Sequence, residues 1–262
     1  MGENMTETYT DIELTEDGGI AILKLNRPDV RNALRPKTFE EIQHAMLHLS
    51  ARVLILTGAD PSFCSGEDVK EGLGGGEQRE RPRIVPRLTP AADVFLYTDI
   101  PVIAAVNGPA VGWGMEMTLM ADFRIASERA KFGELFVLRG LICDSASLGR
   151  LAQLVGREYA TELLLTGQVI DAAEAKRAGL VGRLVGHDDL MSTALSLAER
   201  IAANPPLAVQ GIKNGLRRAL DPDWASLGRW AGEMFAMLGE TEDFREGIRS
   251  FLEKREPKFV GR

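Results

Sequence analysis

Two glycine-containing turns in the sequence have residue types that could stabilise an oxyanion. One is Val111-Gly112-Trp113-Gly114, which follows the apolar run Val102–Val106, and the other is Phe63–Asp68, which follows Val53–Thr57. Each is expected to begin a helix, where the first backbone N–H groups have no partner within the helix and the helix dipole is positive. Two such turns facing each other could hold the negative charge that develops on a carbonyl oxygen.

An acid follows the first turn at a useful spacing. Glu116 comes three residues after Trp113, hence on nearly the same face of the expected helix, so its carboxylate would adjoin the N–H groups of the turn. The alternative is a first-turn glutamate that is merely favoured by the helix dipole. Gly112 and Gly114 permit the turn geometry, and the Trp113 indole is expected to project away from the oxyanion, beside a substrate channel.

Composition excludes several classes of function. The chain has 262 residues, 45% of them hydrophobic, and a formal net charge of −7, which does not suit the basic surface that nucleic-acid binding requires. No apolar run reaches membrane-spanning length, and the acidic amino terminus lacks the features of a secretory signal, so a cytoplasmic protein without a membrane partner is expected. The two cysteines, Cys64 and Cys143, lack metal-ligand spacing, and no metal site is predicted.

The elements that would position these turns are those of an α/β protein. Tyr9–Leu25 predicts two strands around a turn at Gly18-Gly19, and Thr38 with Glu41 predicts a capping box at the start of a helix that ends near Ser50. Continuous apolar runs, which are typical of buried strands, lie at the following positions: Val53–Leu56, Val102–Val106 and Phe123–Ala126.

The last part of the chain has a different character. From about residue 188 the pattern is helical only, with breaks at Pro205-Pro206 and Asp221-Pro222. We therefore divide the chain into a core at residues 1–187, which carries the candidate site, and a carboxyl-terminal helical region at residues 188–262. Apolar side chains share one face of each of two helices after Trp224, and these faces are expected to contact another subunit.

The motifs together resemble a known superfamily. The segments that carry the resemblance occur in the family's order and are these: Leu25-Asn26-Arg27-Pro28 with Asn32-Ala33-Leu34, Phe63–Lys70, Ala105–Gly114, Phe132-Gly133 and Phe251–Phe259. They closely resemble the crotonase superfamily of enoyl-CoA hydratases and isomerases over nearly the whole chain. The resemblance implies a crotonase fold of repeated ββα units with a C-terminal helical trimerisation region. It also implies an acyl-CoA thioester substrate, a homotrimer or dimer of trimers, and no cofactor beyond the coenzyme A of the substrate.

The resemblance also assigns roles to residues of the site. It places the oxyanion-hole N–H groups at Ser65 and Trp113, and the first of the two glutamates of the family's hydratases at Glu116. The second glutamate maps onto Phe136, which cannot move protons and is assigned to the acyl pocket. Glu134 is near in sequence but is expected to point elsewhere.

A substitute carboxylate is available further along the chain. Asp144 occupies a position that resembles the catalytic aspartate of the family's isomerases and dehalogenases, although it could instead cap the helical run that follows. For the coenzyme A end, the resemblance places substrate-binding residues at Arg27, Arg31, Gly66, Asp68, Lys70, Gly112 and Lys258, the last offered by either this subunit or a neighbour.

Several functions fit these residues. The leading hypothesis is an enoyl-CoA hydratase, with Glu116 and Asp144 as its carboxylates. Because the second glutamate is missing, an enoyl-CoA or dienoyl-CoA double-bond isomerase that uses the same two carboxylates is the close alternative. Two others stay open: a non-catalytic acyl-CoA-binding protein, and thioester hydrolysis or dehalogenation through attack by Asp144.

Overall fold

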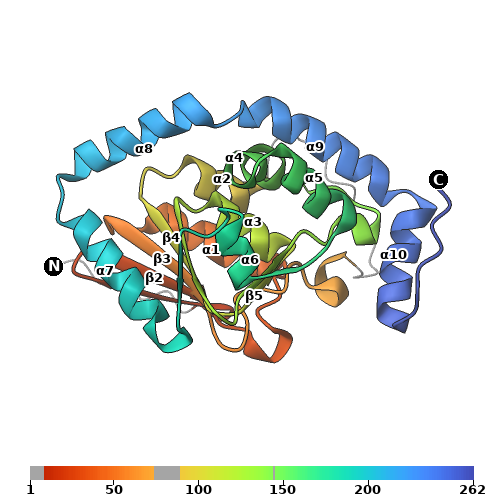
Figure 1. Cartoon of the computed structure of the whole chain (residues 1–262), viewed down its shortest axis with the longest axis horizontal. Helices are drawn as coiled ribbons and strands as arrows, with labels where there is room; N and C mark the ends of the chain where they lie inside the picture. Colours follow the sequence, from red (N-terminus) through yellow and green to blue (C-terminus); the bar gives the residue numbers. More distant parts are fainter. Residues whose placement is uncertain (1–8, 74–88, 144) are drawn as a thin grey trace.

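The core of the chain is a six-stranded sheet with a smaller sheet beside it (Figure 1). The computed structural model describes residues 9–73, 89–143 and 145–262. The main sheet has the order β1-β2-β3-β4-β6-β9, in which only β1 and β2 are antiparallel. Its strands are β1 (Ile12–Asp17), β2 (Ile20–Leu25), β3 (Val53–Gly58), β4 (Val102–Val106), β6 (Phe123–Ser127) and β9 (Arg183–Val185). The small sheet joins β5 (Pro109–Val111), β7 (Lys131–Gly133) and β8 (Ile170–Asp171). The predicted amino-terminal hairpin and the three predicted buried strands are confirmed.

The central strands β3 and β4 are largely apolar because both faces of the main sheet are covered. In β4, Val102, Ala104 and Val106 belong to one hydrophobic cluster, whereas Ile103 and Ala105 belong to another. Successive side chains of a strand point to opposite faces, so a continuous apolar run supplies both clusters. The larger cluster lies under α1 (Pro36–His48), α2 (Pro90–Tyr97) and α3 (Trp113–Met120), and the smaller one under α7 (Leu190–Ala202).

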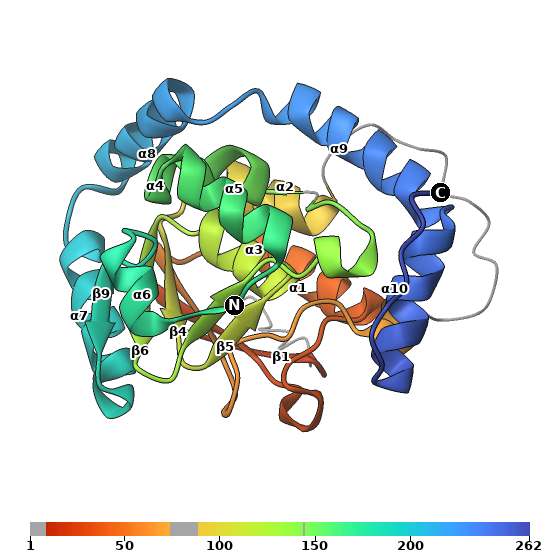
Figure 2. The same cartoon turned by 45° about the vertical axis from the view of Figure 1, so that its right-hand side comes forward.

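The last three helices run around the outside of this core. They are α8 (Pro206–Leu220), α9 (Trp224–Gly239) and α10 (Glu242–Glu253), and they form an arch that begins beyond α7 (Figures 1 and 2). Three shorter helices lie between β7 and β9 in the sequence: α4 (Ala152–Val155), α5 (Arg157–Thr166) and α6 (Ala172–Arg177). Within the described residues, no helix is long and apolar enough to cross a membrane.

The start of α1 differs from its prediction. The helix is capped by Arg35, and the Arg35 N–H donates to the Thr38 hydroxyl over 3.2 Å, so Thr38 is the third residue of the helix and not its cap. Pro36 occupies the first helical position, where a missing N–H costs nothing. The Glu41 carboxylate instead accepts from the backbone N–H of Asp11 over 2.8 Å, which ties α1 to the start of the first strand. The predicted Thr38–Glu41 capping box is therefore wrong.

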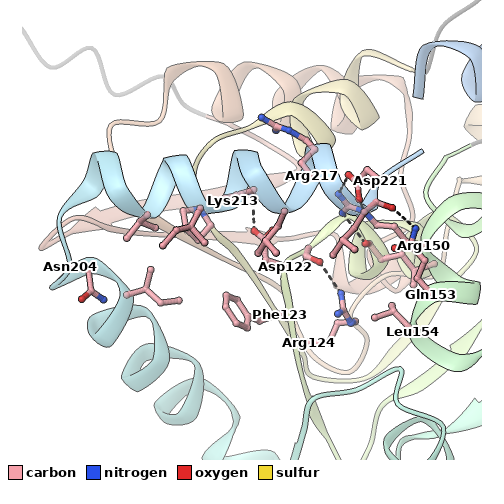
Figure 3. Close-up of a pocket in the computed structure, with 18 residues that line it drawn as sticks. Asp122, Phe123, Arg124, Arg150, Gln153, Leu154, Asn204, Lys213, Arg217 and Asp221 are labelled. Atoms are coloured by element: carbon pink, nitrogen blue, oxygen red, sulfur yellow. Dashed lines mark hydrogen bonds and ion pairs between the residues drawn. The ribbon is translucent and has the colours of Figure 1, made fainter. Parts of the chain in front are cut away.

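Two half-buried arginines, Arg124 and Arg150, hold the carboxyl-terminal end of α3, and Figure 3 shows their side chains. Arg124 donates to the Ala121 carbonyl over 2.8 Å, and Arg150 donates to the Met120 carbonyl over 2.9 Å. These cations complement the negative end of the helix dipole. Burial lowers the pKa of Arg124 to about 10, which still leaves it charged at neutral pH. Arg150 also pairs with Asp221, in the break between α8 and α9, so the outer arch is tied to the end of α3.

Candidate active site

The two predicted turns lie side by side. The Val111 N–H donates to the Cys64 carbonyl, and the Cys64 N–H donates to the Pro109 carbonyl, each over 3.0 Å. A Cβ atom built on Gly66 would lie 3.6 Å from the Trp113 nitrogen. The strand β5 therefore brings the start of α3 against the Phe63–Asp68 turn.

Glycine is required where these two segments touch. A Cβ atom on Gly114 would lie 2.3 Å from the Cys64 carbonyl oxygen, and one on Gly108 would lie 2.2 Å from the Pro61 carbonyl oxygen. Both contacts are with backbone atoms, which cannot swing aside as a flexible side chain can. Gly66, at φ 91°, and Gly112, at φ 52°, adopt the left-handed region that other residues rarely enter.

Trp113 contributes its backbone and its side chain to different places. It is the first residue of α3, capped by Gly112, so no earlier carbonyl of the helix can accept its N–H. Its indole is 3% exposed and packs edge-to-face against Phe39 of α1, with ring centroids 4.9 Å apart. The side chain thus anchors α3 in the main hydrophobic cluster, and its predicted place beside a substrate channel stays a prediction.

The Ser65 turn leads into a π-helical turn, Val69–Leu73. Its backbone N–H already has a partner, which differs from the prediction for a helix start. The Ser65 N–H donates to the Arg31 carbonyl over 3.1 Å, so a thioester oxygen must share this N–H or displace the carbonyl. Arg31 and Asn32 both have φ 56°, and the buried Asn32 amide stabilises this strained turn by donating to the Ser62 carbonyl over 2.7 Å.

Glu116 is fully buried and linked to a second glutamate. Its Oε2 accepts a hydrogen bond from the Ser147 backbone N–H over 3.0 Å, and the Ser147 hydroxyl donates to Glu134 Oε1 over 2.6 Å. The exposed fractions are 0% for Glu116 and 2% for Glu134. Glu134, expected to point elsewhere, is thus one residue removed from Glu116. No local motif indicates this link, because Ser147 lies 31 residues after Glu116 and 13 residues after Glu134.

The other predicted residues of the reaction centre are placed less fully. Asp144 lies outside the described residues; its neighbours Cys143 and Ser145 are buried. Phe136 is half-buried, stands at the start of the 3-10 turn Val137–Arg139 and packs against the main cluster. Burial raises the pKa of the Cys64 thiol to about 12, which makes it a packing group and not a nucleophile.

The residues predicted to bind coenzyme A lie in two parts of the molecule. Arg27 is engaged by carboxylates, with nitrogen–oxygen distances of 3.3 Å to Asp68 and 3.4 Å to Glu71. Arg31 and Lys70 are exposed near the Ser65 turn. Lys258 is exposed on the tail that follows α10, where its N–H donates to Glu246 over 2.9 Å. Across the part of the chain that the structure describes, no three His, Cys, Asp or Glu side chains are grouped to hold a metal ion.

Comparison with known proteins shows the family of the chain. The model of the enoyl-CoA hydratase/isomerase family matches residues 15–262. The chain belongs to the enoyl-CoA hydratase/isomerase family. The resemblance stated from the sequence motifs is therefore confirmed, and the predicted crotonase fold is confirmed by the solved structures that the chain matches.

Relatives cover almost the full length. A probable enoyl-CoA hydratase of Rhizobium meliloti is 34% identical, over 97% of this chain and all of the relative. The 2,3-dehydroadipyl-CoA hydratase of Escherichia coli is 35% identical, over 93% of this chain and 96% of the relative. The crystal structure of a carnitinyl-CoA hydratase from Mycobacterium avium superposes with a TM-score of 0.83 at 34% identity, over 97% of this chain and all of that one.

The contact between the two turns is testable with a single methyl group. We expect Gly114→Ala to lower the free energy of unfolding by about 2 kcal/mol or more, because the added Cβ overlaps the Cys64 carbonyl. Gly232→Ala is the matched control, since Gly232 also lies in an α-helix but has no atom near the added Cβ. It should gain up to about 1 kcal/mol from helix propensity. Urea unfolding of both variants checks the pair; equal stabilities would contradict the close contact.

Proposed function

We propose that the chain hydrates the double bond of a 2-enoyl-CoA thioester, with Glu116 as a catalytic carboxylate. The observation that carries this proposal is the placement of Glu116 in the first turn of α3, whose first N–H lies against the Ser65 turn. A carboxylate fixed beside two backbone donors suits a reaction that places negative charge on a thioester oxygen and moves a proton nearby.

The proposed reaction follows from that arrangement. The thioester oxygen accepts hydrogen bonds from the N–H groups of Ser65 and Trp113, which polarises the conjugated double bond. Water then adds its oxygen at C3 while one of its protons passes to a carboxylate, and the enolate that forms is protonated at C2. Glu116 and Asp144 are the proposed carboxylates for these transfers, because Phe136 stands where the family's hydratases have their second glutamate.

That phenylalanine favours one alternative reaction. Moving a double bond needs one base to take a proton at one carbon and return it at another, so an isomerase can work with Glu116 and Asp144 and needs no bound water. The same substitution motivates a non-catalytic acyl-CoA binder. The buried Glu116 beside the oxyanion donors argues against a binder, which has no use for a carboxylate there.

The phosphates of coenzyme A need cations near the Ser65 turn. We assign Arg31 and Lys70 to this role, because both are exposed there, whereas Arg27 orders the turn through Asp68. Gly66 and Gly112 allow the thioester to approach the backbone closely. Lys258 reaches a phosphate from its own subunit or from a neighbour, and Phe136 lines the acyl pocket.

We further propose that the chain assembles as a homotrimer or a dimer of trimers. The outer helices carry many exposed apolar side chains: Leu207, Ile212, Leu216, Leu220, Trp230, Met237, Phe251 and Leu252. Exposed apolar side chains in this number are typical of helices that are covered by another chain. Sedimentation equilibrium should give three or six times the mass of the chain, and a monomer at micromolar concentration would contradict the proposal.

Oxygen isotope incorporation separates hydration from isomerisation. Incubated with a 2-enoyl-CoA in heavy-oxygen water, the protein should give a 3-hydroxyacyl-CoA that carries the label, detected by mass spectrometry. Migration of the double bond in a 3-enoyl-CoA without any labelled product would instead assign the isomerase reaction. Binding of both thioesters without turnover would contradict both reactions and support the binder.

The oxyanion donor at Trp113 can be removed while the start of α3 is kept. Proline is accepted at the first position of a helix, so Trp113→Pro deletes the N–H while α3 retains its start. The matched control is Trp113→Ala, which loses the same indole and the Phe39 contact but keeps the N–H. We expect turnover by Trp113→Pro to be about a hundredfold below that of Trp113→Ala. Circular dichroism checks that both are folded, and equal turnover numbers would remove Trp113 from the oxyanion hole.

A further inference from the structure

One serine connects two buried glutamates at the candidate site. Ser147 begins the π-helical turn Ser147–Leu151, and it is itself only 1% exposed. Its backbone N–H donates to Glu116 Oε2 and its hydroxyl donates to Glu134 Oε1. The two donors of a single residue are thus given to carboxylates from two different elements, α3 and the segment after β7.

Of the two hydrogen bonds that Ser147 donates, the one from its hydroxyl to Glu134 is the better suited to hold Ser147 in place. The Ser147 hydroxyl lies 2.6 Å from Glu134 Oε1, and a buried hydrogen bond of this kind is costly to leave unmade. Because Glu134 is 2% exposed, water cannot readily replace the serine hydroxyl if it is lost. The hydrogen bond to Glu134 therefore restrains the backbone at Ser147.

The same turn is restrained on its opposite side by the outer helices. A Cβ atom on Gly149 would lie 2.7 Å from the Trp224 ring, so the turn is packed directly against the start of α9. The Trp224 indole N–H donates to Asp221 over 3.1 Å, and Asp221 also holds Arg150. The direction of the Ser147 N–H is consequently set from both sides, by Glu134 and by Trp224.

We propose that Glu134 and Ser147 are positioning residues for Glu116. Glu134 holds the Ser147 hydroxyl, and this orients the Ser147 backbone N–H toward Glu116 Oε2. The bond to Oε2 sets the rotation of the Glu116 carboxylate and so the atom that it presents to the substrate. The inference rests on the proposed function for the role of Glu116, but the contacts that support it do not.

Substitutions that break only the link between Glu134 and Ser147 test the proposal. Ser147→Ala keeps the N–H toward Glu116 and removes the hydroxyl, and Glu134→Leu removes the acceptor. Both should lower kcat for 2-enoyl-CoA hydration about tenfold to a hundredfold, the scale of a misplaced catalytic group, with KM within about threefold. Ser147→Thr, which keeps a hydroxyl, and Glu134→Gln, which keeps an acceptor, should stay within about fivefold of the wild-type kcat. The double variant should be no slower than the slower single variant.

A second buried serine separates this role from a general loss of packing. Ser127 is fully buried, and its hydroxyl donates to the Asn107 carbonyl over 2.9 Å, between β6 and the end of β4. Ser127→Ala should lower stability while leaving kcat within about twofold. If Ser147→Ala or Glu134→Leu folds and keeps its kcat, or changes only KM, the positioning role is overturned.

The failure of the proposed function has a different signature. If the wild-type protein hydrates no 2-enoyl-CoA, that function falls, and crystal structures of Ser147→Ala and Glu134→Leu decide the inference. It predicts that Glu116 Oε2 and the nitrogen of residue 147 separate beyond about 3.5 Å, outside hydrogen-bonding range. Retention of that bond in both variants would overturn it.

Discussion

The close packing of two backbone segments, 61–66 and 108–114, is the constraint on which the site depends. The segments exchange hydrogen bonds through Cys64 and approach so closely that side chains are excluded at Gly108 and Gly114. This approach brings the Ser65 turn and the first N–H of α3 together. Because α3 begins at the contact, the position of Glu116 in its first turn follows directly from the same packing.

The carboxyl-terminal end of α3 is also held by specific contacts. All its residues are buried, and its last carbonyls accept hydrogen bonds from Arg124 and Arg150. A helix that is fixed at both ends cannot slide along its axis. The distance between the Glu116 carboxylate and the turn at the start of α3 is therefore kept constant. Through Asp221 and Trp224, the arch of α8, α9 and α10 contributes to this restraint. The carboxyl-terminal region therefore supports the site even within one subunit.

Much of the fold could be predicted because its signals are local. The continuous apolar runs of β3 and β4 and the glycine-flanked start of α3 each follow from a few adjacent residues. The start of α1 was misassigned because Thr38 can serve either as a cap or as the third residue of a helix, and the choice was decided by Arg35 and Pro36. The Ser65 N–H donates to the Arg31 carbonyl, and no local pattern indicates this contact because Arg31 is distant in sequence.

The part of the site that the sequence could not predict depends on long-range contacts. The role of Glu134 cannot be predicted from the sequence, because periodicity along one segment says nothing about a serine thirteen residues later. The Trp113 indole packs against Phe39, which belongs to a helix that no motif links to it. For both Glu134 and Trp113, a tertiary contact determines what the residue does, and local sequence spacing does not indicate that contact.

A crystal structure with a bound, unreactive acyl-CoA analogue would test the central claim most directly. The account predicts that the thioester oxygen lies about 3 Å from the backbone nitrogens of both Ser65 and Trp113, with the Arg31 carbonyl displaced from the Ser65 N–H or sharing it. It also predicts that the Glu116 carboxylate faces C2 and C3 of the acyl group. A thioester oxygen bound away from these two nitrogens, with Glu116 remote from the acyl carbons, would contradict the account.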